Sequence, residues 1–213
     1  MTRDQIGGLL QTEMRIVFPP GEARMMNRWI AIAAVTLVSL FSISNPAAAA
    51  KSNVCEREMA SAAGAEGVPL GVLYAVGLTE TGRKGSLSPY ALNIEGKTVF
   101  ASSERQALLE FRKAKASGKK LIDLGCMQIN HFYHGDEFAS VAEMFDPHEN
   151  VQYAARFLKQ LKAQEGSWTM AVARYHAGPD NDPAQKRYIC AVIRNLVATG
   201  FGNWTPESQQ FCR

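Results

Sequence analysis

The strongest hydrophobic pattern in the chain lies over residues 68–82, in the stretch VPLGVLYAVGLTETG. Its apolar residues recur at helical spacing, and Leu73 and Val76 fall on one stripe. The next position on that stripe is Glu80, just before a glycine that suits a helix end. The pattern therefore predicts a helix over 69–81 whose inward face carries a carboxylate in its last turn, where a cleft can open.

The same criteria predict further helices and one small hairpin. Apolar periodicity, capping residues and glycine stops indicate helices over about 55–65, 104–117, 147–165, 168–177 and 183–199. The segment YALNIEGKTVF, at 90–100, has two short β-prone arms around Glu95-Gly96 and predicts a hairpin. LIDLGCMQIN, at 121–130, is predicted to be an apolar strand or loop, and the tail over 200–213 to be irregular. The chain is thus expected to be mainly α-helical.

Residues 28–50, RWIAIAAVTLVSLFSISNPAAAA, have the order of a secretory signal peptide. A transmembrane anchor is the alternative, but the apolar run contains polar residues and is shorter than about 20 residues. Residues 1–24 have no signal character, so we expect translation to start at Met25 or Met26. The expected organisation is a non-native upstream extension over 1–24, a signal peptide over 25–50 and one exported, periplasmic domain over 51–213.

The charge balance is mild, with 23 Lys and Arg against 20 Asp and Glu and a formal net charge of +3. Nucleic-acid-binding domains are usually strongly basic, so no nucleic-acid partner is expected. A local basic run between Arg112 and Lys120 has two interpretations. It is either a solvated helix face or a surface weakly attracted to an anionic polymer.

Four cysteines follow the signal segment: Cys55, Cys126, Cys190 and Cys212. An even number in an exported chain favours disulfides, and four cysteines allow three pairings. Cys126 lies in the apolar context LGCMQI, so a buried free thiol is an alternative for it. Zinc is disfavoured, because no CxxC is present and His131 and His134 alone are weak ligand spacing. No metal or other cofactor is expected.

The position of Glu80 suggests its chemistry. A carboxylate on an apolar helix face is desolvated, and desolvation favours the protonated form. A carboxyl group that stays protonated near neutral pH can donate its proton to a leaving oxygen, as the general acid does in glycosidic bond cleavage. The alternative is a satisfied ion pair, or a side chain that turns to solvent at the helix end.

Two later segments carry groups suited to sugars. GCMQIN, at 125–130, places Met127 beside Gln128 and Asn130, whose amides each offer a donor and an acceptor to hydroxyl and acetamido groups. RYHAGP, at 174–179, ends a helix with Tyr175, whose hydroxyl is within reach of a buried carboxyl group. Core packing or helix capping is the alternative for each segment alone.

Taken together, these segments resemble the catalytic domain of soluble lytic transglycosylases, which are relatives of goose-type lysozyme. That family shows a helix ending in E-S-x, then G-L-M-Q-I, then A-Y-N-A-G. This chain has, in the same order, Glu80-Thr81-Gly82, Gly125-Cys126-Met127-Gln128-Ile129 and Arg174-Tyr175-His176-Ala177-Gly178. The similarity extends from about Val54 to about Leu196. It implies an α+β, lysozyme-like domain that is mainly helical, with a small β-hairpin beside the active-site cleft.

The resemblance also implies roles for single residues. Glu80 would be the catalytic acid and base, Met127 and Gln128 would line the sugar cleft, and Tyr175 would bond or orient the catalytic carboxyl group. Asn130, next in the same segment, is a further substrate-binding candidate.

The chain departs from the family pattern at four places. Thr81 replaces the usual serine, Cys126 replaces a leucine, and His176 replaces an asparagine. The interval between Glu80 and Gly125 is also long, because it holds the predicted hairpin and the helix after it.

The reaction that the resemblance implies needs a single carboxyl group. Glu80 would protonate the oxygen that links N-acetylmuramic acid to N-acetylglucosamine, while the 2-acetamido group stabilises C1. The C6 hydroxyl would then attack C1 and leave a 1,6-anhydro end. Most glycosidases use two carboxylates; here Asp123 and Glu95 are candidates for a second one by position only.

Two other functions are compatible with the same residues. A hydrolytic muramidase would share Glu80 but leave reducing ends. A non-catalytic peptidoglycan-binding module would need no acid, and the presence of Glu80 argues against it. The expected partner is the peptidoglycan glycan strand. An envelope-spanning secretion or motility apparatus is a further hypothesis, suggested by the small size of the domain.

Overall fold

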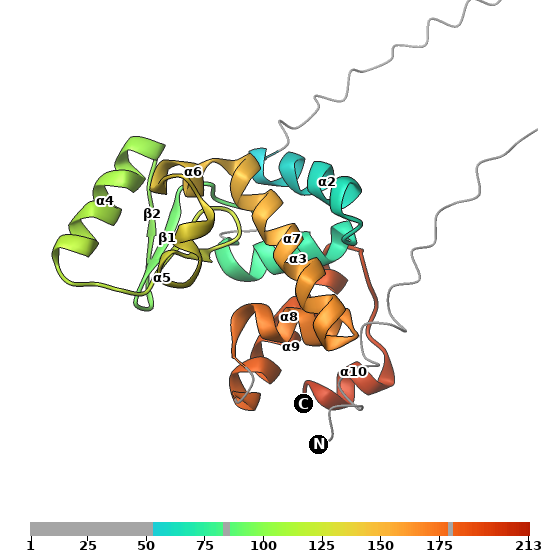
Figure 1. Cartoon of the computed structure of the whole chain (residues 1–213). Coiled ribbons are helices and arrows are strands. Elements are labelled where there is room, and N and C mark those ends of the chain that lie inside the picture. The colour runs from blue at the N-terminus through green and yellow to red at the C-terminus, as the bar shows by residue number, and fades with distance from the viewer. Residues whose placement is uncertain (1–52, 83–85, 179–180) are drawn as a thin grey trace, which may run out of the picture. The chain divides into compact units, whose positions relative to one another are not determined.

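The computed structural model describes residues 53–82, 86–178 and 181–213. The expected upstream extension, the signal segment and the methionines proposed as start sites lie outside these residues. The described part consists of helices packed together with a small antiparallel sheet (Figure 1). None of its helices is both long and apolar enough to span a membrane.

All six predicted helices are present, with ends that differ by a few residues at most. They are α2 (Val54–Glu66), α3 (Leu70–Thr81), α4 (Glu104–Ala116), α7 (Pro147–Glu165), α8 (Trp168–His176) and α9 (Asp182–Ala198). The ends follow the local chemistry. The Asp146 side chain accepts hydrogen bonds from the first backbone N–H groups of α7, and Gly166 ends this helix with φ of 82°.

Four short helical segments have no signal in the hydrophobic pattern. They are α5 (His131–His134), η1 (Gly135–Glu137), α6 (Val141–Phe145) and α10 (Pro206–Phe211). The prediction of an irregular tail is therefore wrong for 206–211, where Thr205 and Ser208 form a capping box. Segments this short make few helical hydrogen bonds and show no clear period, so tertiary contacts decide them.

The predicted hairpin is present and belongs to a larger sheet. Strands β1 (Ala91–Ile94), β2 (Lys97–Phe100), β3 (Ile122–Leu124) and β4 (Ile129–Asn130) form an antiparallel sheet in the order β2-β1-β3-β4. The segment predicted as a strand or loop is thus two short strands joined by a tight turn. Gly125, with φ of 81°, begins that turn, and a Cβ there would lie 2.5 Å from Nδ2 of Asn150.

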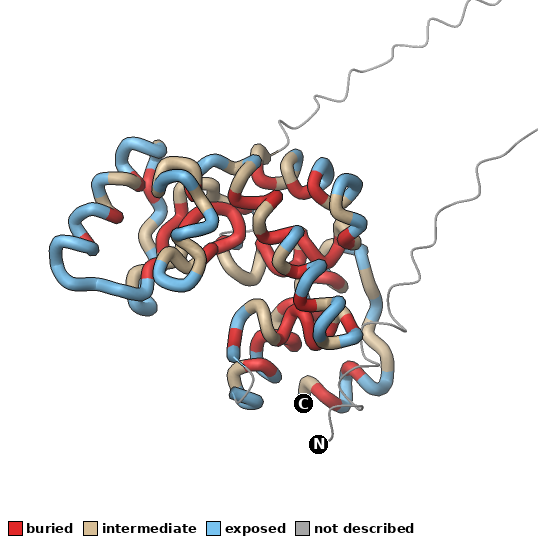
Figure 2. Tube along the Cα trace, viewed as in Figure 1, coloured by how far each residue is buried: buried red, intermediate tan, exposed pale blue. Residues whose placement is uncertain are grey.

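The core lies between the helices. Helix α3 contacts α2 and α9, and α7 contacts α2 and α8. Figure 2 shows that buried positions gather where these helices face one another, whereas α4, beyond the sheet, is exposed along most of its length. Helices α2 and α3 approach closely at Gly77, where a Cβ would lie 2.4 Å from the Met59 methyl carbon. This packing buries the inward face of α3 up to its last turn.

Both disulfides join segments that lie far apart in the sequence. Cys55 of α2 pairs with Cys126 of the β3–β4 turn, and Cys190 of α9 pairs with Cys212 after α10. The alternative of a buried free thiol at Cys126 is therefore wrong, because α2 brings a second cysteine to the same buried place. No group of three metal-binding side chains occurs among the described residues.

We expect the two disulfides to contribute unequally to stability. Cys55–Cys126 closes a separation of 71 residues and Cys190–Cys212 one of 22, so the chain-entropy model gives about 4 and about 3 kcal/mol. Cys55 and Cys126 are also fully buried, so truncating them leaves a cavity. The Cys55→Ala/Cys126→Ala variant should therefore unfold at lower urea concentration than Cys190→Ala/Cys212→Ala. The reverse order would contradict this assignment.

Candidate active site

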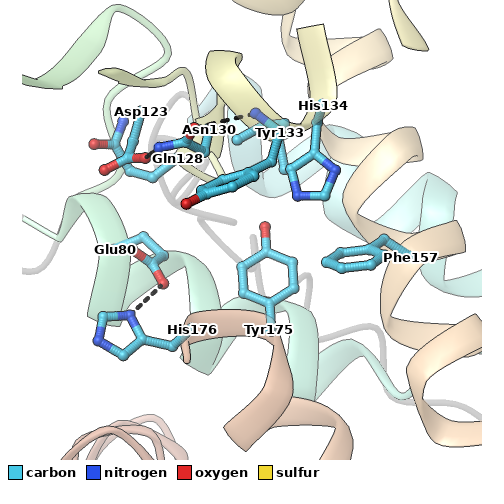
Figure 3. A pocket seen from close by; sticks show the side chains of 10 residues that line it. Glu80, Asp123, Gln128, Asn130, Tyr133, His134, Phe157, Tyr175 and His176 are labelled. Atoms are coloured by element: carbon cyan, nitrogen blue, oxygen red, sulfur yellow. Dashed lines mark hydrogen bonds and ion pairs between the residues drawn. The ribbon is translucent and has the colours of Figure 1, made fainter. Parts of the chain in front are cut away.

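A pocket of about 160 Å³ opens at the end of α3 (Figure 3). Segments from across the chain meet there: the last turn of α3, strands β3 and β4, α5, the middle of α7 and the end of α8. The lining residues are Glu80, Asp123, Gln128, Ile129, Asn130, Tyr133, His134, Phe157, Tyr175 and His176. The pocket therefore combines ionisable groups, amides and aromatic rings, as a carbohydrate site requires.

Glu80 lies in this pocket with a side chain only 16% exposed. Burial raises the pKa of its carboxyl group to about 8. A hydrogen bond from Tyr188 opposes that rise, and the charge of Asp123 adds to it. Burial and the charge of Asp123 thus both favour a protonated carboxyl group at neutral pH, as expected for an inward-facing Glu80, and together they outweigh the hydrogen bond from Tyr188.

Tyr188 of α9, which sequence reasoning missed, is the hydrogen-bond partner of Glu80. Its hydroxyl group donates to Oε1 of Glu80 at 2.5 Å. The expectation that Tyr175 bonds this carboxyl group directly is wrong, because the Tyr175 hydroxyl donates to the Met127 carbonyl at 2.7 Å. Tyr188 lies among apolar residues of α9, where its spacing is that of an ordinary core residue. Only the packing of α9 on α3 distinguishes it.

His176 also approaches Glu80. Its Nδ1 lies 4.0 Å from Oε1 of Glu80 (Figure 3). Its ring stacks on Tyr188, with centroids 4.2 Å apart and an interplanar angle of 3°. Burial and the nearby charge of Arg187 lower the pKa of the His176 imidazole. The chain thus places an aromatic, titratable ring where the family pattern has an asparagine.

Met127 and Gln128, neighbours in the amide-rich segment, contribute to the site in different ways. The Met127 side chain is fully buried and packs near Gly77, outside the pocket lining, so this residue reaches the site only through its backbone. Gln128 lines the pocket, and its Nε2 donates to the carbonyls of Ala91 and Gly125. The amide oxygen of Gln128 is therefore the group available to a ligand.

Asn130 lines the pocket, but its side chain forms hydrogen bonds with neighbouring residues of the protein. Its Nδ2 donates to Oδ1 of Asp123 at 2.6 Å, and its Oδ1 accepts from the backbone N–H groups that begin α5. The side chain therefore fixes both Asp123 and the start of α5.

The two candidates for a second carboxylate lie in different environments. Asp123 of β3 lines the same pocket as Glu80, and burial raises the pKa of its carboxyl group, against a hydrogen bond from Asn130. Glu95 lies at the exposed turn of the β1–β2 hairpin, away from the pocket, in an ion pair with Lys119. Of these two candidates, Asp123 shares the pocket with Glu80 and Glu95 does not.

Aromatic side chains line the part of the pocket away from Glu80 (Figure 3), and of these only Tyr175 was expected in the site from the sequence. Tyr133 is 68% exposed, and His134 packs on Phe157 with ring centroids 4.9 Å apart. Nδ1 of His134 shares a hydrogen bond with the Tyr153 hydroxyl at 2.8 Å. Flat apolar faces beside polar edges are the kind of surface on which sugar rings pack.

Comparison with family models gives one match: the model described as the transglycosylase SLT domain covers residues 59–191. That interval contains Glu80, Tyr188 and the 125–129 and 174–178 segments. Comparisons with curated proteins and with solved structures give no match. Because the matched interval covers more than half of the chain, the chain belongs to the transglycosylase SLT domain family, whose function is directed at peptidoglycan.

Proposed function

We propose that this protein is a lytic transglycosylase that cleaves the bond between N-acetylmuramic acid and N-acetylglucosamine in peptidoglycan. The observation that carries the proposal is Glu80, whose buried carboxyl group has a pKa of about 8 and faces a polar pocket. A group with this pKa is protonated at neutral pH and can act as a general acid there.

The reaction uses the Glu80 carboxyl group twice, first as an acid and then as a base. Glu80 transfers its proton to the glycosidic oxygen as the bond from that oxygen to C1 of N-acetylmuramic acid breaks, and the 2-acetamido group of the same sugar stabilises C1. The Glu80 carboxylate then takes the proton of the C6 hydroxyl, and O6 forms a bond to C1. A 1,6-anhydro end results, no water is consumed and Glu80 regains its proton.

The surrounding groups have supporting roles in this proposal. The Gln128 amide oxygen accepts a hydrogen bond from a sugar hydroxyl or acetamido N–H group. The Tyr188 hydroxyl donates to Glu80 and stabilises its carboxylate form between the two proton transfers. Tyr175 holds the Met127 carbonyl and so keeps the segment of Gln128 in place, and its ring is part of the sugar-binding wall.

A hydrolytic muramidase is the second candidate, and the position of Asp123 favours it. Asp123 shares the pocket with Glu80, so it offers a second carboxyl group that can activate water. The two reactions differ in the mass of one water in their products, so mass spectrometry of digested peptidoglycan distinguishes them.

We further propose that the domain acts in the periplasm after removal of the segment over 25–50. The support is the order of charged, apolar and small residues in that segment, together with two disulfides, which persist in oxidising compartments. A role beside a secretion or motility apparatus would use the same chemistry and is a hypothesis from the sequence alone.

Glu80→Gln should abolish peptidoglycan cleavage. Glutamine keeps the shape of the side chain and accepts the hydrogen bond from Tyr188, but it delivers no proton. Release of muropeptides from purified peptidoglycan measures the effect. Glu95→Gln is the matched control, because it removes an exposed carboxylate outside the pocket and should cleave like the unmodified protein. Near-normal cleavage by Glu80→Gln would move the acid assignment to Asp123.

Activity should fall as the pH rises through about 8, because Glu80 must be protonated to start the reaction. The pH profile of muropeptide release measures it.

The raised pKa of Glu80 also makes the stability of the folded protein depend on pH. A folded-state pKa raised above its unfolded value means that the folded protein keeps a proton that the unfolded chain releases between about pH 4.5 and 8. Over this range the unmodified protein should lose stability relative to Glu80→Gln, by a few kcal/mol. Urea unfolding of both proteins at pH 5 and pH 8.5 measures this loss. An equal change in the free energy of unfolding of the two proteins between these pH values would contradict the raised pKa.

Tyr188→Phe and Tyr175→Phe should have different effects. A hydrogen bond to a charged group is worth roughly 1.5–3 kcal/mol, so loss of the Tyr188 hydroxyl should slow cleavage by about 10- to 150-fold. It should also move the alkaline limb of the pH profile upward, since this bond lowers the pKa of Glu80.

Tyr175→Phe leaves the Met127 carbonyl without its donor, so it should lower stability by about 1–3 kcal/mol and leave the alkaline limb in place. If the alkaline limb moved upward for Tyr175→Phe and stayed in place for Tyr188→Phe, the two tyrosines would have the opposite roles.

A further inference from the structure

His176 is the most informative departure of this chain from the family pattern. It replaces an asparagine in the A-Y-N-A-G segment, at the end of α8. An asparagine side chain neither stacks on a tyrosine ring as an aromatic does nor gains a charge on acidification. The histidine does both, and it does so beside the proposed acid.

The ring of His176 is held in a defined position by its contacts. It lies nearly parallel to the Tyr188 ring, at 3° and 4.2 Å, and Tyr188 is itself buried. Its Nδ1 lies 4.0 Å from Oε1 of Glu80, the same oxygen that accepts the Tyr188 hydrogen bond. The opposite edge is open, since the side chain is 45% exposed. The imidazole therefore exchanges protons with solvent while it faces the acid.

Among the described residues, the charged and titratable groups next to this ring come from three helices, and Asp123 of β3 lines the same pocket. Glu80 faces it from α3, Tyr188 and Arg187 from α9, and Tyr175 is its neighbour on α8. Arg187 disfavours the protonated imidazole, as does burial. At neutral pH, then, the ring is uncharged while Glu80 carries its proton.

We propose that His176 is a positioning residue that sets the acid strength of Glu80 according to pH. Its stacked ring keeps the Tyr188 hydroxyl group on Oε1, and its protonated form presents a positive charge to the same oxygen. The inference rests on the proposed function, because it assigns a pH response to the same reaction.

The direction of the response follows from charge. An imidazolium about 4 Å from a carboxyl group favours the carboxylate, so protonation of His176 makes Glu80 a stronger acid. The Glu80 carboxyl group stays protonated, because its pKa is about 8 when His176 is neutral. Proton transfer to the glycosidic oxygen therefore becomes easier on acidification. The proton that His176 binds comes from solvent and stays on the ring, so it takes no part in the reaction.

The test is the ratio of the cleavage rate one pH unit below the NMR titration midpoint of His176 to the cleavage rate at pH 7. For the unmodified protein we expect a ratio of about three to ten, since one pKa unit of acid strength is a factor of ten and proton transfer is partial in the transition state. His176→Phe keeps a flat ring for the stack and removes the charge, so its ratio should fall to about one. His176→Asn also removes the stack, so it should lose the ratio and in addition be slower than His176→Phe at pH 7.

His148→Phe is the matched control. His148 is an exposed histidine of α7 that pairs with Glu58, outside the pocket, so its loss should leave the ratio unchanged. In the unmodified protein, the NMR titration of His176 should have its midpoint below the usual histidine pKa and coincide with the acid-side step in activity. Circular dichroism of each variant checks that it is folded.

The outcomes separate the two levels of the proposal. If the unmodified protein releases no muropeptides, the proposed function fails and the inference with it. If it cleaves peptidoglycan but His176→Phe keeps the full ratio, the inference alone is overturned. The same holds if the NMR midpoint of His176 does not coincide with the activity step.

Discussion

The site depends on the attachment of one turn, Gly125–Gln128, to the buried end of α3. The Thr81 hydroxyl, one residue after Glu80, donates to the Cys126 carbonyl, and Cys126 is bonded to α2 through its disulfide. Asn150, fully buried in α7, accepts from the Met127 N–H. Its Nδ2 donates to the carbonyls of Leu124, just before the turn, and of Met144 in α6. The turn is therefore bonded to α3, α2 and α7, and these bonds fix its place beside the end of α3 that carries Glu80.

This arrangement explains why the turn is polar although it lies in the core. Buried amides and carbonyls are costly unless they are paired. Here the Asn150 oxygen accepts from the Met127 N–H, the Asn150 amide nitrogen donates to the carbonyls of Leu124 and of Met144 in α6, and Tyr175 supplies the donor for the Met127 carbonyl. In this chain the segment thus contributes chiefly a backbone path. The Met127 side chain fills the core, and Gln128 lines the pocket.

The same rigidity makes a desolvated acid tolerable. A carboxyl group with a pKa of about 8 destabilises the folded protein at alkaline pH, because ionisation there occurs in a partly buried place. Tyr188 reduces this cost by a hydrogen bond, and the disulfide beside the site removes conformational freedom from the unfolded chain. The two disulfides and the helical core stabilise the fold, and this stability offsets the cost of keeping the Glu80 carboxyl group partly buried.

The sequence by itself determined the six longer helices, the hairpin, the inward position of Glu80 and the family, because each depends on periodicity, capping residues or short local motifs. It did not determine the cysteine pairing, the short helix α10 or the partner of the acid. Tyr175 and Tyr188 both look like core tyrosines in the sequence, and the hydrogen bond that separates them joins residues 108 positions apart. Asp123 and Glu95 likewise differ only after the sheet forms and carries one into the pocket and the other to an exposed turn. Such choices belong to the tertiary structure, because the distance between two side chains on different elements is set by how those elements pack and leaves no period in the sequence.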